Sequence, residues 1–129
     1  MAVDLVDLRS ETTVDGYKWM LTMLEEYSGF VSAVALEGKH ADKVAQSFMM
    51  VFCASHGLPR SVRSDQGSEF LAEFSDALKA NGVQKITAAV DRPQSNGLIE
   101  RMHRELKVVI KGLIQTRGLK SNEWNQVLA

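Results

Sequence analysis

The sequence is poor in cysteine: Cys53 is the only one among its 129 residues. A single cysteine forms no intrachain disulfide, so we expect a reducing compartment and an inert, buried thiol. With only three histidines, the chain also excludes a self-contained zinc site, whose cysteine and histidine ligands come in closely spaced pairs. Any metal that the chain holds must therefore be bound through oxygen.

Long hydrophobic runs are also absent. No stretch approaches the ~20 apolar residues of a membrane-spanning helix, and the opening Met1–Asp4 segment is unlike the charged start of a signal peptide. We therefore expect an intracellular protein. Its length predicts one domain, residues 1–129, and its 45% hydrophobic content predicts a packed core. A start within a strand and an end within a helix-like run indicate a piece cut from a longer protein.

The sequence has no overall excess of basic charge, because its formal net charge is −1. A slightly negative net charge is unusual for a protein that binds nucleic acid, so the distribution of charge along the chain must be considered. Residues 98–120 carry six basic and two acidic side chains, a net charge of +4, which leaves −5 for the rest. The basic charge is therefore concentrated in one segment, which we predict to be helical.

Apolar periodicity and turn residues predict the order of the elements. The predicted strands cover residues 2–9, 17–25, 30–36, 61–65 and 84–90, and the predicted helices cover 41–55, 71–80 and 98 onward. Residues 91–97 are predicted to be a loop, because they contain proline and glycine. This order predicts an α/β fold with a five-stranded mixed sheet. Strands one to three form an antiparallel meander, and helices connect the remaining strands and flank the sheet.

Two acidic residues occupy positions where sites are commonly built. Asp65 ends a short apolar strand, and Glu100 lies in the first turn of the last predicted helix. Because sites in such sheets gather beyond strand ends, Asp65 could meet both this helix and Asp4 of the opening strand. Carboxylates suit hard divalent cations, and two such ions can promote displacement at a phosphodiester. Without metal, carboxylates about 4 Å apart repel by about 4 kcal/mol, which raises a pKa or displaces a side chain.

The last predicted helix has two distinct faces. Its apolar stripe consists of Ile99, Met102, Leu106, Val109 and Leu113. Glu100, Arg104, Lys107 and Lys111 follow one another at steps of four, three and four, which places them together on the opposite face. We expect this face to hold metal at its start and to follow phosphates along its length, with His103 close enough to touch the substrate.

Two longer motifs surround these acids. The segment from Ser64 to Phe70, Ser-Asp-Gln-Gly-Ser-Glu-Phe, is similar to the Asp-x-Gly-x-x-Phe segment of retroviral and retrotransposon integrases. The segment from Pro93 to Arg101, Pro-Gln-Ser-Asn-Gly-Leu-Ile-Glu-Arg, is similar to the Pro-Gln-Ser-x-Gly-x-x-Glu segment of the same family. Their order and the basic helix that follows argue against a chance match. Over nearly its whole length, the chain resembles the catalytic core of these integrases, which belong to the RNase H-like nucleotidyl transferases.

The resemblance implies an RNase H-like fold and a metal-dependent enzyme of DNA integration. The family's acidic triad falls on Asp4, Asp65 and Glu100, which would hold two Mg²⁺ or Mn²⁺ ions. The implied reactions are trimming of the element's DNA ends by water and attack of the freed 3′ hydroxyls on target DNA. Double-stranded DNA is the implied partner, in a homodimer or larger assembly that is nuclear when it acts on chromosomal DNA.

The predicted DNA contacts are polar and basic side chains near or along the last helix: Gln94, Asn96, His103, Arg104, Lys107 and Lys111. The chain departs from the family in two respects. Residues 66–99 form a gap of 34 residues between the second and third acids, one shorter than in retroviral members. His103 and Arg104 stand where the family often has asparagine and lysine, and both can still contact DNA.

Each assignment has a simpler alternative. Asp7, three residues after Asp4 and on the other face of the strand, could be the first acid, although the resemblance favours Asp4. Asp65 could serve only as a turn former, and Glu100 could only stabilise the positive end of a helix. The basic face could be an ordinary solvated surface. The whole chain could also be a nuclease that cuts without joining, or an inactive relative that binds DNA or forms dimers.

Overall fold

The computed structural model describes residues 1–65, 67, 70, 72–87 and 93–128, with the backbone alone at 87 and 93–96. A sheet of five strands runs through it in the order β3-β2-β1-β4-β5. The strands are β1 (Ala2–Asp7), β2 (Trp19–Leu24), β3 (Val31–Leu36), β4 (Ser61–Ser64) and β5 (Gln84–Thr87). The first three are antiparallel, whereas β4 pairs in parallel with both β1 and β5. The predicted mixed sheet is confirmed, and residues 88–90 of its last predicted strand lie outside the described part.

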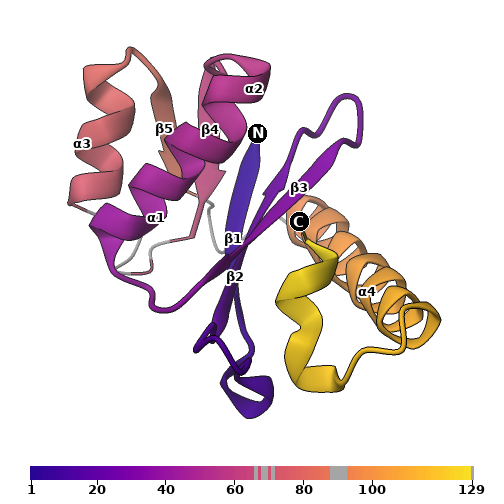
Figure 1. The fold of residues 1–129 in the computed structure, drawn as a ribbon. Helices are drawn as coiled ribbons and strands as arrows, with labels where there is room; N and C mark the ends of the chain where they lie inside the picture. The colour runs from indigo at the N-terminus through magenta and orange to yellow at the C-terminus, as the bar shows by residue number, and fades with distance from the viewer. Residues whose placement is uncertain (66, 68–69, 71, 88–92, 129) are drawn as a thin grey trace.

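Helices cover both faces of the sheet (Figure 1). One face carries α1 (Ala41–Ser47), the π-helical η2 (Phe48–Cys53), α2 (Ala54–His56) and α3 (Glu73–Ala80). The other carries α4 (Pro93–Thr116) and the 3-10 helix η4 (Ser121–Val127), and a short 3-10 turn, η1 (Arg9–Glu11), follows β1. Among the residues described, no helix is both long and apolar enough to cross a bilayer.

Strand β2 is buried on both faces, which explains its almost wholly apolar sequence. Leu21 and Met23 point into the main core beneath α1, η2 and α3, together with Phe48 and Phe74. Met20 packs on the opposite face in a second cluster, against residues of α4 and η4. The sheet therefore separates two hydrophobic layers, and α4 covers the face opposite to the other α-helices.

The predicted helix over residues 41–55 forms, but its middle is π-helical. In the segment from Phe48 to Cys53 the helix is wider than an α-helix, which hydrophobic periodicity does not reveal. Phe48 and Phe52 are both buried there, with stacked rings whose centroids are 5.9 Å apart. Cys53 is only half-buried, not buried as expected, and this partial burial raises the pKa of its thiol.

Helix α4 corrects the sequence analysis at two points. It begins at Pro93, so residues 93–97 are helical and not part of a loop. Proline suits the first position of a helix, because its missing N–H would have no partner there and its φ is already helical. Val109 is 55% exposed and does not belong to the apolar stripe, and Ile110 is buried in its place. Val109 follows Leu106 by three residues and Ile110 follows it by four. Both spacings fit one helix face, so periodicity alone did not show which residue is buried.

The segment after α4 packs back on the sheet and binds the short turn η1 that follows β1. Trp124 of η4 is buried beside Met20 and Ile110. Its indole N–H donates a hydrogen bond of 2.8 Å to the carbonyl oxygen of Glu11. Trp124 packs in one cluster with Ile110 of α4 and with Val6 of β1, the strand that carries Asp4. This buried tryptophan therefore holds α4 against β1.

Candidate active site

Asp4 lies in the middle of β1, on the face that α4 covers. Its antiparallel partner in the sheet is Thr22 of β2, whose side chain points to the same face. One carboxylate oxygen, Oδ1, accepts a hydrogen bond of 2.8 Å from the Leu5 amide. The other oxygen, Oδ2, lies 3.6 Å from Nε2 of His103 on α4. The first candidate acid is thus held between its own strand and the helix.

His103 faces the sheet and not the exposed side of α4. Its side chain is only 20% exposed, and its Nε2 lies 3.0 Å from the Thr22 hydroxyl. Burial lowers the pKa of His103; the nearby Asp4 carboxylate opposes this effect and Lys107 adds to it. The predicted DNA contact through His103 stays a prediction, and the imidazole lies in contact with the acidic site.

Asp65 comes directly after β4, where the parallel pairing of β4 with β1 brings it near Asp4. Its Oδ1 accepts a hydrogen bond of 2.8 Å from the Gly67 amide, so it also forms the turn that the alternative interpretation assigned to it. The carboxylate nevertheless remains exposed. Forming the turn and binding a ligand are therefore compatible roles for this residue.

Glu100 is exposed on α4 and completes a set of three acids around one cavity. This cavity has a volume of about 220 Å³. Its lining residues come from β1, β4, the residue after β4, and α4: Val3, Asp4, Arg63, Ser64, Asp65, Ile99, Glu100 and His103. The structure thus brings together all three acids that the sequence analysis selected, from three different elements.

The donor chemistry of this cavity fits a hard divalent cation, because its three acids offer only carboxylate oxygens. Within the described ranges, however, no group of three or more histidine, cysteine, aspartate or glutamate side chains is close enough to hold a metal ion as it stands. Asp65 and Glu100 are exposed, so rotation of their side chains can change this spacing.

Asp7, the alternative first acid, belongs to the other face of the sheet. Its cross-strand partner is Trp19, which packs on the main core and not under α4. Arg9 binds the Asp7 carboxylate at 2.6 Å, and this hydrogen bond lowers the pKa of Asp7. Asp7 does not line the cavity of the three acids. The geometry therefore favours Asp4.

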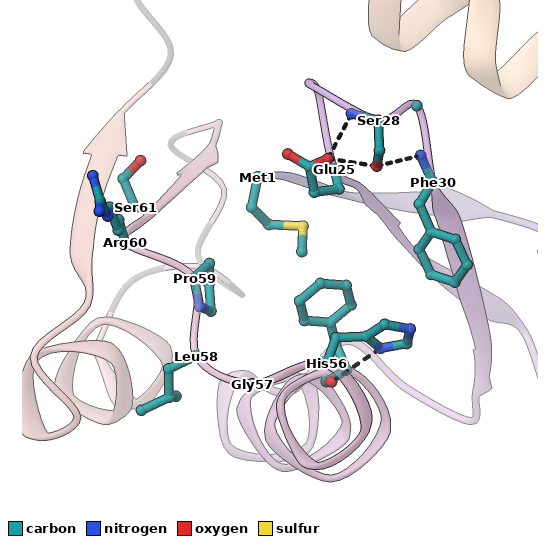
Figure 2. A pocket seen from close by; sticks show the side chains of 12 residues that line it. Met1, Glu25, Ser28, Phe30, His56, Gly57, Leu58, Pro59, Arg60 and Ser61 are labelled. Atoms are coloured by element: carbon teal, nitrogen blue, oxygen red, sulfur yellow. Dashed lines mark hydrogen bonds between the residues drawn. The ribbon is translucent and has the colours of Figure 1, made fainter.

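A larger cavity of about 760 Å³ lies elsewhere, between the β2–β3 turn and the segment after α2 (Figure 2). The rings of Phe30 and His56 lie side by side there, with centroids 4.7 Å apart and planes tilted by 45°. Among the described residues that line it, the one carboxylate is that of Glu25, which accepts hydrogen bonds from Ser28 that lower the pKa of Glu25. Volume alone thus does not locate the acidic site, and we assign the chemistry to the smaller cavity.

The basic face of α4 continues from Glu100 away from the cavity. Arg104, Lys107 and Lys111 are all exposed, and no ion pair between described residues engages them. Arg101, by contrast, pairs with Glu105 one turn along the helix at 3.0 Å. The side chains of the two other predicted DNA contacts, Gln94 and Asn96, lie outside the described residues.

Comparison with known proteins identifies the family. A family model described as "Integrase core domain" matches residues 2–93, most of the chain. The chain belongs to the integrase core domain family. The matched part of this integrase core contains Asp4 and Asp65 and ends before Glu100. The third acid is therefore supported by the cavity geometry and the sequence motif, and not by the family match.

Retroviral polyproteins are similar to this integrase core. The Pol polyprotein of feline endogenous virus ECE1 is 32% identical over 115 residues, which cover 88% of this chain and 11% of that protein. The Gag-Pol polyprotein of avian reticuloendotheliosis virus is 34% identical over 109 residues, which cover 83% of this chain and 10% of that protein. The chain thus spans about a tenth of the length of these relatives.

Solved integrase structures share the fold. The catalytic core domain of BIV integrase matches with a TM-score of 0.74 and 23% identity, over 98% of this chain and 78% of that one. A chain of a simian T-cell lymphotropic virus intasome matches with a TM-score of 0.78 and 19% identity, over 98% of this chain and 45% of that one. The predicted RNase H-like fold is confirmed.

The sequence analysis missed two residues that organise the site. Thr22 is a polar residue inside the apolar run Met20–Leu24, and this interruption was a signal that could have been followed. Lys85 of β5 donates hydrogen bonds to the Phe70 carbonyl oxygen and, at 3.0 Å, to the Ser75 hydroxyl. Burial lowers the pKa of Lys85, and nearby Asp65 opposes that shift. Lys85 thereby ties the segment after Asp65 to α3.

Proposed function

We propose that this integrase core domain catalyses metal-dependent 3′-end processing and strand transfer of retroelement DNA into target DNA. One observation carries the proposal. Asp4, Asp65 and Glu100, which come from three elements, line one cavity in a chain of the integrase core domain family. The proposal of metal-assisted chemistry is supported by the donor type, because these acids offer only carboxylate oxygens, which suit hard divalent cations.

The acids of the cavity would bind the catalytic cations. When bound, two Mg²⁺ or Mn²⁺ ions would offset charge on the phosphodiester and orient the attacking and leaving oxygens. Asp4, Asp65 and Glu100 would hold these ions through their carboxylate oxygens. Asp4 is the most constrained of the three, because Leu5 and His103 contact its two oxygens. Glu100, exposed at the start of the basic face, can move toward the other acids once a cation is present.

Helix α4 would hold the DNA beside the acids. Arg104, Lys107 and Lys111 form an exposed positive stripe that begins one turn after Glu100. Phosphates bound along this stripe would place a strand end at the cavity, because acid and bases share one side of the helix. Gln94 and Asn96, at the start of α4, are further proposed contacts.

Removing positive charge from this stripe should lower the affinity for DNA and make that affinity less sensitive to salt concentration. We expect Arg104→Ala/Lys107→Ala to lower affinity for double-stranded DNA and to reduce the slope of log K against log salt by about 2. The matched control is Lys43→Ala/Lys79→Ala, which removes two exposed charges from α1 and α3 on the opposite face of the sheet. Titrations by fluorescence anisotropy at several salt concentrations measure both quantities. Equal losses in the two double variants would show that α4 is not the DNA-binding face.

The proposed active form is a homodimer or larger assembly on DNA. This proposal is supported by the likeness to a chain of an intasome, the assembly named for the simian T-cell lymphotropic virus structure.

The proposed function is tested by titrating Mg²⁺ or Mn²⁺ into the protein and assaying joining of a branched DNA substrate. We expect metal-dependent products in which two strands have been joined. Cut but unjoined products would instead support a nuclease of the RNase H-like class. DNA binding without any metal-dependent product would support the third alternative, an inactive relative that binds DNA.

A further inference from the structure

The most unusual buried group beside the acidic cavity is the hydroxyl of Thr22. Thr22 is 0% exposed and lies in the middle of an otherwise apolar strand, directly opposite Asp4. A buried hydroxyl is costly unless it forms hydrogen bonds, and this one has two partners. It donates to the backbone carbonyl oxygen of Asp4 at 3.2 Å and lies 3.0 Å from Nε2 of His103.

The arrangement of donors and acceptors around His103 favours one of its two tautomers. With the Thr22 hydroxyl donating to the Asp4 carbonyl oxygen at 3.2 Å, its oxygen is free to accept a hydrogen bond from Nε2 of His103 at 3.0 Å. Nε2 of His103 also lies 3.6 Å from Asp4 Oδ2, which accepts only. A proton on Nε2 can be donated to the Thr22 oxygen, whereas an unprotonated Nε2 would place its lone pair beside the Asp4 carboxylate, so we expect the neutral imidazole to carry its proton on Nε2.

We propose that Thr22 and His103 are positioning residues that orient Asp4 for cation binding, an inference that rests on the proposed function of the three acids. Thr22 holds the backbone of β1 at Asp4, and His103 holds one side of the carboxylate. The Leu5 amide holds the other oxygen at 2.8 Å. The Asp4 side chain nevertheless remains 31% exposed, so this support leaves it open to a ligand from the cavity.

This support has a measurable consequence for metal affinity. Removing a group that orients a metal ligand commonly lowers metal affinity by about 10- to 100-fold, because the ligand must then be ordered when the ion binds. Thr22→Val keeps the shape of the side chain and removes only the hydroxyl. We expect it to weaken Mn²⁺ binding about tenfold, and we expect His103→Phe, which removes Nε2, to do the same. Thr22→Ser restores the hydroxyl and should restore affinity.

The first measurement needs no metal and no DNA. Nitrogen chemical shifts of the histidine rings, recorded by NMR on the metal-free protein near pH 7.5, report which ring nitrogen carries the proton. We expect His103 to be the Nε2–H tautomer in the wild-type chain. An Nδ1–H tautomer, or a rapid mixture of the two, would overturn the proposal.

The second measurement is Mn²⁺ binding, followed by paramagnetic broadening of NMR signals from residues around the cavity. Thr13→Val is the matched control, because it removes another buried hydroxyl that does not line the cavity of the acids. The Thr13 hydroxyl accepts a hydrogen bond of 2.9 Å from the Tyr17 amide. His40→Asn changes an exposed histidine. Both controls should bind Mn²⁺ like the wild type. Wild-type affinity in Thr22→Val would overturn the positioning role.

The two kinds of failure can be told apart. A wild-type protein that neither binds Mn²⁺ at the cavity nor joins DNA would count against the proposed function, whatever the tautomer of His103. A wild-type protein that does both, while Thr22→Val and His103→Phe match it in Mn²⁺ affinity, would leave the proposed function intact and exclude the positioning role. Chemical shifts of distant amides establish that each variant is folded.

Discussion

Replacement of Asp4 by asparagine is expected to lower metal-dependent DNA joining by on the order of 100-fold or more. Asparagine keeps the size of the side chain and removes the charge that would hold a cation in the cavity. A loss of about 3 kcal/mol of transition-state stabilisation corresponds to a factor of about 100 in rate. Glu100→Gln, at another residue that lines the same cavity, is expected to show a loss of the same order. Joined products from a branched DNA substrate with Mn²⁺ provide the measurement.

The matched control for this experiment is Asp7→Asn, in the same strand. Asp7 faces the opposite side of the sheet and is bound by Arg9 at 2.6 Å. Because this pair is exposed and does not line the cavity, its loss should leave joining near the wild-type rate. If Asp7→Asn abolished joining and Asp4→Asn did not, the first acid would be Asp7, and the site drawn here would be wrong.

Replacement of Phe74 by alanine is expected to destabilise the domain by about 3–5 kcal/mol, as is usual for a buried aromatic residue. Phe74 of α3 is 0% exposed. Its ring lies 5.3 Å from the ring of Phe70 and 5.7 Å from that of Phe48, measured between centroids. Its removal would leave a cavity between α3 and the sheet. Urea unfolding, followed by tryptophan fluorescence, gives the change in free energy of unfolding.

Tyr27→Ala is the control for that measurement, because Tyr27 is an aromatic residue that is 99% exposed. We expect a change within about 0.5 kcal/mol. The comparison also bears on the site, since Phe70 packs on Phe74 and its carbonyl oxygen is bound by Lys85, close to Asp65. A loss below about 1 kcal/mol in Phe74→Ala would mean that α3 is not packed on the sheet as described.

Much of the architecture was predictable because local patterns and packing agreed. The helices around Val44 and Phe74 repeat apolar residues at steps of three and four, and the strands around Leu21 and Val62 are short segments bounded by turn residues. The wrong predictions fell where two local signals competed. Pro93 and Gly97 indicate a turn in many contexts, yet here they lie in the first turns of α4. The π-helical turns from Phe48 to Cys53 leave no mark in the sequence pattern.

The acids of the candidate site were predictable, whereas their partners were not. Asp65 and Glu100 stand out in recognisable motifs, at a strand end and a helix start. The contact between His103 and Thr22 joins residues 81 positions apart in the sequence, and its existence depends on how α4 lies across the sheet. Periodicity placed His103 near the basic face, but packing turned its imidazole toward Asp4.

The sequence by itself determined the order of strands and helices, the family motifs and the two acids within them, because these depend on residue types at short spacing. Only the tertiary structure showed that Asp4 and not Asp7 lines the cavity, that Ile110 and not Val109 is buried, and that His103 turns toward the sheet. Each of these choices depends on which side of a strand or helix meets another element. That is a property of long-range packing, to which neighbours in the sequence contribute little.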